Sequence, residues 1–388
     1  MSPSESDSAA PRPRLFKRLV FALLPTLVLL GGAEGAIRLW GLANPTVRSM
    51  PLPGEYEGLF RSDDLLMWSI QPGTDLEFQG ARVTANSLGI RGEEIGAKAP
   101  GEFRILSLGE STTFGPGVPN DGTYTARLGE LLREADAAEG RAADRVQTIN
   151  GGVPAYSSFQ SLLYLQERGV ELEPDLVLFY HQVNDYLPSS LRTSSNDEVG
   201  LSRSDRQIHE SRHRAVEKWL GRSALFRFLS LRMARARIEK LQEGEGEVEN
   251  PLFEIGLPDI GLGARTVDMT SGIDAASGLS EKSLPTRVTR DERRQNFEEL
   301  AAFCEAEGIR LLVIHPSYRE SRGHEKLLVD FCEEKGVAMF DALPVLHPEG
   351  VVPDEMFRDA MHPSARGHEA LAQALARRIL TDGLHRDD

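Results

Sequence analysis

The chain is poor in cysteine and has no excess of positive charge. Only Cys304 and Cys332 are present among 388 residues, each in a helical-looking stretch before an apolar segment. A disulfide framework is therefore not predicted, and two semi-buried thiols are the simplest interpretation. The 44 Lys and Arg residues face 59 Asp and Glu residues, which gives a formal net charge of −15. Since phosphate binding needs a basic face, we expect no nucleic-acid partner.

A long uninterrupted apolar run is also missing, although one segment is strongly membrane-like. The run from Leu19 to Ala33 is followed by Glu34 and Arg38 before the apolar residues resume toward Leu42. Four basic residues precede the run: Arg12, Arg14, Lys17 and Arg18. We interpret residues 1–18 as a cytoplasmic tail and 19–42 as a single transmembrane signal anchor, with the rest of the chain periplasmic or extracellular. A cleaved signal peptide is the alternative, because residues 32–36 are small enough for a peptidase.

Short apolar segments alternate with helical patterns through the remainder of the chain. Its length and 40% hydrophobic content suffice for one large domain or two modest ones. Five segments resemble buried parallel strands: 105–108, 146–149, 176–180, 311–314 and 337–340. Helices are expected at 121–138, 157–169, 291–307, 322–335 and 364–380. This alternation predicts an α/β fold, a flavodoxin-like, doubly wound sheet of five parallel strands that binds ligands at its carboxyl edge.

Two segments stand outside that alternation. Residues 43–100 are rich in Pro and Gly and predict a linker with a small β-rich lead-in to a domain spanning 101–388. Residues 186–290 form an insertion too long for an ordinary crossover. Its first half is helical and rich in Arg, and its second half predicts a Gly-rich loop. A helix that covers the domain with solvated Arg residues is favoured over one that lies on an anionic lipid surface.

Ser111 directly follows the first apolar strand, in the string Gly109-Glu-Ser-Thr-Thr-Phe-Gly115. Asp359 and His362 lie three residues apart near the C-terminus. A serine hydroxyl becomes a nucleophile when an imidazole takes its proton and a carboxylate orients that imidazole. The three residues therefore predict a serine hydrolase. The string lacks the second Gly of the G-x-S-x-G elbow, so an α/β-hydrolase fold is disfavoured.

Four strings resemble, in order, the motifs of the SGNH (GDSL) hydrolase superfamily over about 104–185 and 291–380. The string around Ser111 resembles the first motif, with Glu110 where the family usually has Asp. The second is Asn150-Gly-Gly-Val-Pro-Ala155, and the third is Gln182-Val-Asn184-Asp185, which resembles G-x-N-D with Gln in place of Gly. The last, Asp359-Ala-Met-His362, is similar to the D-x-x-H motif.

The resemblance implies the SGNH hydrolase fold and a set of roles. Ser111 would be the nucleophile, His362 the base and Asp359 its orienting carboxylate. An oxyanion hole would combine the N–H groups of Ser111 and Ala155 with the side-chain amide of Asn184. Ala155 stands where the family has Gly, and its backbone N–H is equally available.

The expected protein is thus a membrane-anchored, bacterial-type extracytoplasmic serine esterase that needs neither a metal nor an organic cofactor. Its substrate would be an ester, with an O-acylated carbohydrate preferred and a lipid or simple ester as alternatives. Polysaccharide O-acetyl transfer remains open, because hydrolysis and transfer share one acyl-enzyme.

Two alternatives belong to other classes of protein. The string His209-Glu-Ser-Arg-His213 satisfies H-E-x-x-H, the pattern of a zinc metallopeptidase. Its cationic surroundings and the lack of a recognisable third ligand favour an exposed helix instead. A non-catalytic anchored binding module is the other alternative, although such a copy would be expected to lose Ser111, Asn184 or His362, and all three are present.

Overall fold

The computed structural model describes residues 13–40, 58–141, 145–187, 189, 200, 202–213, 215–243, 286–321 and 323–385. Its centre is a parallel sheet made of β5 (Phe103–Gly109), β6 (Val146–Gly152), β7 (Leu176–Tyr180), β8 (Arg310–His315) and β9 (Ala338–Asp341). The strand order is β6-β5-β7-β8-β9, the flavodoxin-like arrangement in which the first strand lies between the second and the third. The predicted α/β class and five-stranded parallel sheet are confirmed.

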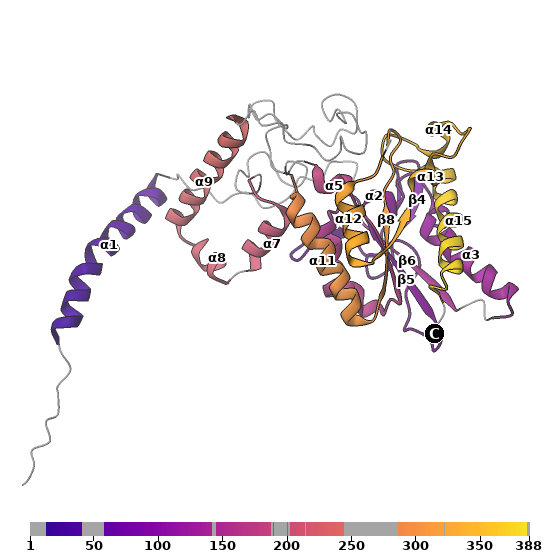
Figure 1. Ribbon diagram of the computed structural model, residues 1–388. Helices are drawn as coiled ribbons and strands as arrows, with labels where there is room; N and C mark the ends of the chain where they lie inside the picture. Colours follow the sequence, from indigo (N-terminus) through magenta and orange to yellow (C-terminus); the bar gives the residue numbers. More distant parts are fainter. Residues whose placement is uncertain are drawn as a thin grey trace, which may run out of the picture.

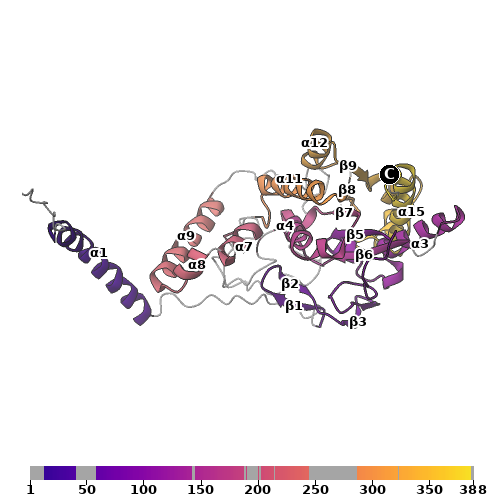
Figure 2. The same ribbon diagram turned by 90° about the horizontal axis from the view of Figure 1, so that it is seen from below.

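Helices cover both faces of the sheet, as Figures 1 and 2 show. Phe103 and Ile105 point to the face packed by α3 (Tyr124–Ala138) and α15 (Ala365–Thr381). Leu106 and Leu108 alternate to the other face, which is covered by α4 (Ser158–Tyr164), α11 (Arg290–Glu307) and α12 (Lys326–Lys335). Every residue of β5 and β7 is buried. Because both faces are covered, these strands are continuously apolar rather than alternating.

Both cysteines lie in the helices of this second face. Cys304 is on α11 and Cys332 on α12, and both are free thiols buried in the same apolar cluster. Burial raises the pKa of each thiol to about 12. They therefore act as small apolar side chains of the core.

Two hairpins precede the sheet. Strand β1 (Phe60–Asp63) pairs with β2 (Met67–Ile70), and β3 (Asp75–Phe78) pairs with β4 (Ala81–Thr84), both antiparallel. Figure 2 shows β1, β2 and β3 grouped along one side of the sheet. Their buried side chains pack against residues that follow β5 and β6, in a cluster that includes Trp68, Val83, Phe114, Tyr156 and Phe159. The hairpins therefore cover the loops at the carboxyl edge of the sheet.

The insertion contributes α7 (Asp205–His213), α8 (Ala215–Leu220) and α9 (Ala224–Glu243). Figure 1 shows α8 and α9 away from the sheet, with α9 next to α1 (Pro13–Leu39). The chain entering and leaving the insertion is held together, because Asp205 N–H donates to Arg287 O at 2.7 Å and Arg287 N–H donates to Leu187 O at 2.9 Å. The predicted Gly-rich loop falls mainly on 244–285, outside the described residues.

Helix α1 contacts α9 through a carboxylate cap. Glu34 accepts hydrogen bonds from the Ser223 hydroxyl and from the N–H groups of Ala224 and Leu225, at 2.7 to 2.8 Å. Among the helices of the described residues, none is long and apolar enough to cross a membrane. The predicted spanning segment 19–42 is therefore not supported. Helix α1 ends at Leu39 and includes the charged Glu34 within its length.

Candidate active site

Three neighbouring strands end at the same level of the sheet. Gly109 at the end of β5 is in register with Gly152 of β6 and Tyr180 of β7. The three predicted residues Ser111, Ala155 and Asn184 follow these strand ends by two, three and four residues, respectively. The parallel register therefore brings segments far apart in the sequence to one edge. Ligands of open α/β sheets bind at this edge.

Ser111 opens the short helix α2 (Ser111–Phe114) directly after β5. The turn between them depends on Gly109. A Cβ atom there would lie 2.0 Å from Thr113 Oγ1 and 2.9 Å from the Tyr180 carbonyl oxygen. Only glycine allows so close an approach, which explains why the motif has Gly at this position.

His362 and Asp359 complete a hydrogen-bonded chain with Ser111. His362 Nε2 lies 2.9 Å from Ser111 Oγ, and its Nδ1 lies 2.9 and 2.8 Å from the two Asp359 carboxylate oxygens. Asp359 Oδ1 also accepts the backbone N–H groups of Met361, at 2.9 Å, and His362, at 2.8 Å. Since a carboxylate only accepts, the imidazole proton is on Nδ1 and Nε2 is free to accept from the serine hydroxyl.

Asp359 is held in its charged form. Burial acts to raise its pKa, but the hydrogen bond and charge of His362 and the two backbone N–H groups outweigh burial and lower the pKa to about 2. The carboxylate therefore stays ionised across the ordinary pH range. It orients one imidazole tautomer and could stabilise a positive charge on that ring.

Donors for a developing oxyanion lie at the same edge. Among the described residues, the N–H groups of Ser111 and Ala155 have no acceptor. Asn184 Nδ2 donates one hydrogen to the Tyr156 carbonyl oxygen at 3.0 Å, which leaves its second hydrogen available. Ala155 has a φ of +63°, in the left-handed region that favours glycine. This backbone conformation accounts for the Gly that the resemblance implies at this position.

Glu110 links the turn at Ser111 to the Asn184 segment. Its side chain is buried, and its carboxyl oxygens lie 3.3 Å from the Asn184 backbone N and 3.4 Å from the Tyr318 hydroxyl. Burial and the nearby charge of Asp185 raise the Glu110 pKa to about 8. The carboxyl group is therefore largely protonated at neutral pH.

A fully buried ion-pair network includes the segment that follows β7. Arg293 on α11 pairs with both Asp185 and Glu325, and none of the three side chains is exposed. Gln182 Nε2 donates to Glu325 at 3.0 Å, so the residue that replaces a motif Gly takes part in this network. Neither Arg293 nor Glu325 was predicted from the sequence. Their partners are more than 30 residues away along the chain, so no local pattern identifies them.

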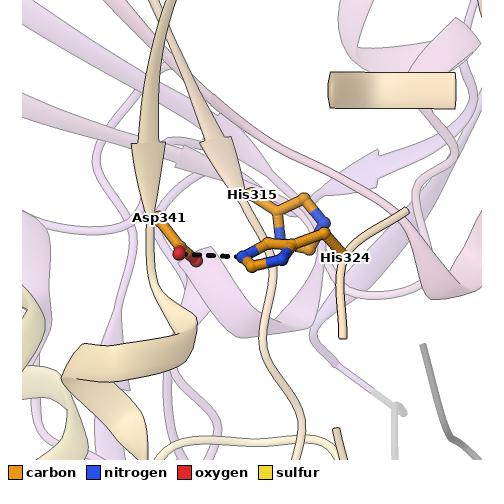
Figure 3. A group of neighbouring side chains, drawn as sticks. All are labelled: His315, His324 and Asp341. Atoms are coloured by element: carbon orange, nitrogen blue, oxygen red, sulfur yellow. Dashed lines mark hydrogen bonds and ion pairs between the residues drawn. The ribbon is translucent and has the colours of Figure 1, made fainter. Parts of the chain in front are cut away.

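A separate cluster of potential metal ligands lies at the ends of β8 and β9. Figure 3 shows His315, His324 and Asp341, whose ligand atoms lie within 4.8 Å of one another. His324 Nε2 lies 2.8 Å from Asp341 Oδ2. His315 Nε2 accepts the Glu325 N–H at 2.8 Å, and burial, aided by the charge of His324, lowers the His315 pKa to about 4.

The protonation of His315 limits what this cluster binds. The neutral ring has one proton, and since Nε2 accepts a hydrogen bond, that proton is on Nδ1. His324 and Asp341 are then the members of the cluster with free lone pairs. Two ligands are fewer than the three or four protein ligands of typical zinc sites.

The H-E-x-x-H segment lies on α7. His209 is partly buried, with its ring in an edge-to-face contact with Phe159 at 5.6 Å between centroids and its Nδ1 3.4 Å from the Leu65 carbonyl oxygen. The His213 side chain lies outside the described residues. Among the side chains that are described, His209 belongs to no cluster of three potential metal ligands.

Searches against protein-family profiles and against curated proteins find no match. Solved structures with a similar arrangement include LAE5, an alpha/beta hydrolase enzyme from the metagenome of Lake Arreo, Spain, at 15% identity and a TM-score of 0.40, covering 74% of this chain and 97% of that one. A putative lipolytic protein of the G-D-S-L family from Desulfitobacterium hafniense matches at 11% identity and a TM-score of 0.35, covering 71% and 99% of the two chains. Axe2, an acetylxylan esterase from Geobacillus stearothermophilus, matches at 15% identity and a TM-score of 0.38, covering 71% of this chain and 94% of that one. All three likenesses have a TM-score of 0.40 or lower.

Proposed function

We propose that the protein is a serine esterase of the SGNH type, with Ser111 as nucleophile, His362 as general base and acid, and Asp359 as the orienting carboxylate. The observation that carries the proposal is the unbroken hydrogen-bonded chain from Asp359 through His362 to Ser111 Oγ. A lone serine after a strand is an ordinary turn residue. A serine in contact with a correctly oriented imidazole at the carboxyl edge of the sheet meets the geometric requirement for nucleophilic catalysis.

The proposed reaction has two steps on one acyl-enzyme. Ser111 Oγ attacks the ester carbonyl while its proton passes to His362 Nε2, and the carbonyl oxygen becomes an oxyanion. His362 then gives the proton to the departing alcohol, and the acyl group remains on Ser111. Water, deprotonated by His362, releases the acid and restores the serine.

The oxyanion would be held by the N–H groups of Ser111 and Ala155 and by the second amide hydrogen of Asn184. Each such donor contributes about 100-fold or more to kcat in enzymes of this kind. The free state of the two backbone donors supports this role, because no competing acceptor among the described residues has to be displaced.

The substrate class we propose to test first is an O-acetylated carbohydrate, with lipids and simple esters as alternatives. Transfer of the acetyl group to a carbohydrate is a second candidate reaction, because it uses the same acyl-enzyme and differs only in the acceptor that reaches it. A panel of p-nitrophenyl esters, acetylated xylo-oligosaccharides and a short-chain phospholipid separates these classes. Turnover that disappears in Ser111→Ala supports the proposal, and turnover of every ester within twofold of wild type in that variant refutes it.

The proposed location is outside the cytoplasm, on the basis of the basic residues that precede the apolar run of residues 19–33. A reporter fused after Asp388 that is active only outside the cytoplasm tests this directly. Activity of a cytoplasm-only reporter at the same position would contradict the location and the preference for envelope carbohydrates.

A further inference from the structure

Two side chains from outside the sheet hold the peptide units on either side of Ala155. The Trp68 indole N–H donates to the Pro154 carbonyl oxygen at 3.3 Å. The Arg287 guanidinium donates to the Ala155 carbonyl oxygen at 2.5 Å. Trp68 lies on β2, and Arg287 lies near the end of the insertion. We propose that Trp68 and Arg287 are positioning residues that fix the Ala155 N–H in the oxyanion hole, an inference that rests on the proposed function.

The first contact sets the direction of the donor. The Pro154 carbonyl and the Ala155 N–H belong to one planar trans peptide unit, so they point in opposite directions. When Trp68 holds the carbonyl on the hairpin side, the N–H is directed to the opposite side. A rotation of this one peptide unit would remove the donor from the site without disturbing the sheet.

The second contact matters because Ala155 is in an unfavourable backbone conformation. A non-glycine residue remains in the left-handed region only when its surroundings hold it there. Arg287 binds the carbonyl on the C-terminal side of Ala155, and Trp68 binds the one on its N-terminal side. The two contacts together restrict both peptide units and therefore both dihedral angles of the residue.

Both positioning residues are buried and make further contacts of their own. Arg287 pairs with Asp205 at 2.8 Å, and the exposed fractions of the two side chains are 1% and 0%. The Arg287 guanidinium also stacks over the Trp68 ring, 5.5 Å from its centroid. The Trp68 carbonyl in turn accepts the Tyr156 hydroxyl at 2.7 Å. Residues of the hairpin, the insertion and the loop after β6 thus form one buried unit.

This arrangement gives the hairpins and the insertion, which lie outside the central sheet, a function in the reaction. The hairpins supply Trp68, and the insertion supplies Asp205 in its first half and Arg287 near its end. The insertion would then be required for full turnover even though it contributes no residue that touches the reacting atoms.

The test compares variants of the full chain in kcat, KM and melting temperature with p-nitrophenyl acetate. Trp68→Phe keeps the aromatic packing but removes the N–H, and Trp219→Phe is the matched control because Trp219 is 67% exposed on α8. We expect Trp68→Phe to lower kcat about 10-fold with KM within twofold, part of the roughly 100-fold that complete loss of an oxyanion donor costs. Arg287→Lys, which keeps a positive charge near Asp205, should act in the same direction.

Rescue by Ala155→Gly separates positioning from simple stability. Glycine populates the left-handed region about as readily as the right-handed one, so residue 155 needs less support in that background. Trp68→Phe should therefore lower kcat less than threefold when combined with Ala155→Gly. A loss caused only by looser packing would be the same in both backgrounds.

The outcomes separate the two proposals. Turnover that depends on Ser111, together with an unchanged kcat in Trp68→Phe or an equal loss in the Ala155→Gly background, overturns the positioning role alone. A wild-type chain without Ser111-dependent turnover overturns the proposed function and this inference with it.

Discussion

Replacement of Asp359 by Asn is expected to invert the tautomer of His362. Asp359 Oδ1 accepts two backbone N–H groups, those of Met361 and His362. An Asn side chain would keep its only oxygen on these donors, because an amide nitrogen there would face two N–H groups. Its NH₂ group then takes the place of Oδ2, 2.8 Å from His362 Nδ1. Nδ1 must become the acceptor, and the proton moves to Nε2, which can no longer take the proton of Ser111.

The size of this effect follows from the loss of the general base. A triad with the wrong imidazole tautomer loses about 10⁴-fold in kcat. KM and melting temperature should change little, since the amide oxygen still satisfies both backbone donors. The assay is initial-rate hydrolysis of p-nitrophenyl acetate, with Asp354→Asn as control because that carboxylate is 70% exposed on α14 (Pro353–Met356). A kcat within 10-fold of wild type for Asp359→Asn would refute the assigned tautomer.

Three further changes test other parts of the site. Asn184→Ala should cost roughly 3 kcal/mol of transition-state stabilisation, or about 100-fold in kcat, and an unchanged kcat would remove Asn184 from the oxyanion hole. Glu110 retains its proton to about pH 8 when folded, whereas an unfolded Glu releases it at about pH 4.3. The folded chain thus binds more protons between these values, and its free energy of unfolding falls as pH rises. In urea unfolding at several pH values, the free energy of unfolding should fall less steeply with pH for Glu110→Gln than for wild type. Identical slopes in the two proteins would contradict the raised pKa. Dialysis against a strong chelator should leave esterase activity unchanged, whereas a loss reversed only by zinc would favour the H-E-x-x-H segment.

The sheet was predictable because its strands are buried on both faces. A strand covered on both sides is a continuous apolar run in the sequence. Such runs predicted the ends of β5 and β7 to within two residues. The alternation with helices predicted a doubly wound sheet, because right-handed crossovers leave few topologies. The predicted membrane-spanning segment was not supported, since its apolar run is short and charged residues follow it.

The residues that support the site were not predictable, because their partners are distant in the sequence. Arg293 is one of several Arg residues in a helix with a strongly polar sequence, and only the folded chain places it against Asp185 and Glu325. Likewise, the sequence around Trp68 is that of an ordinary strand, and only the fold shows that its indole N–H donates to the Pro154 carbonyl oxygen. Local patterns specify elements, whereas buried polar contacts of this kind depend on the complete fold.

The most direct test of the central claim is to locate the nucleophile chemically. The full chain is treated with a serine-directed fluorophosphonate, and the modified residue is identified by peptide mass spectrometry. The account predicts one adduct per chain, on Ser111, that forms slowly in Asp359→Asn and is absent in Ser111→Ala. Labelling that persists at an equal rate in Ser111→Ala, or an adduct on another residue, would contradict it.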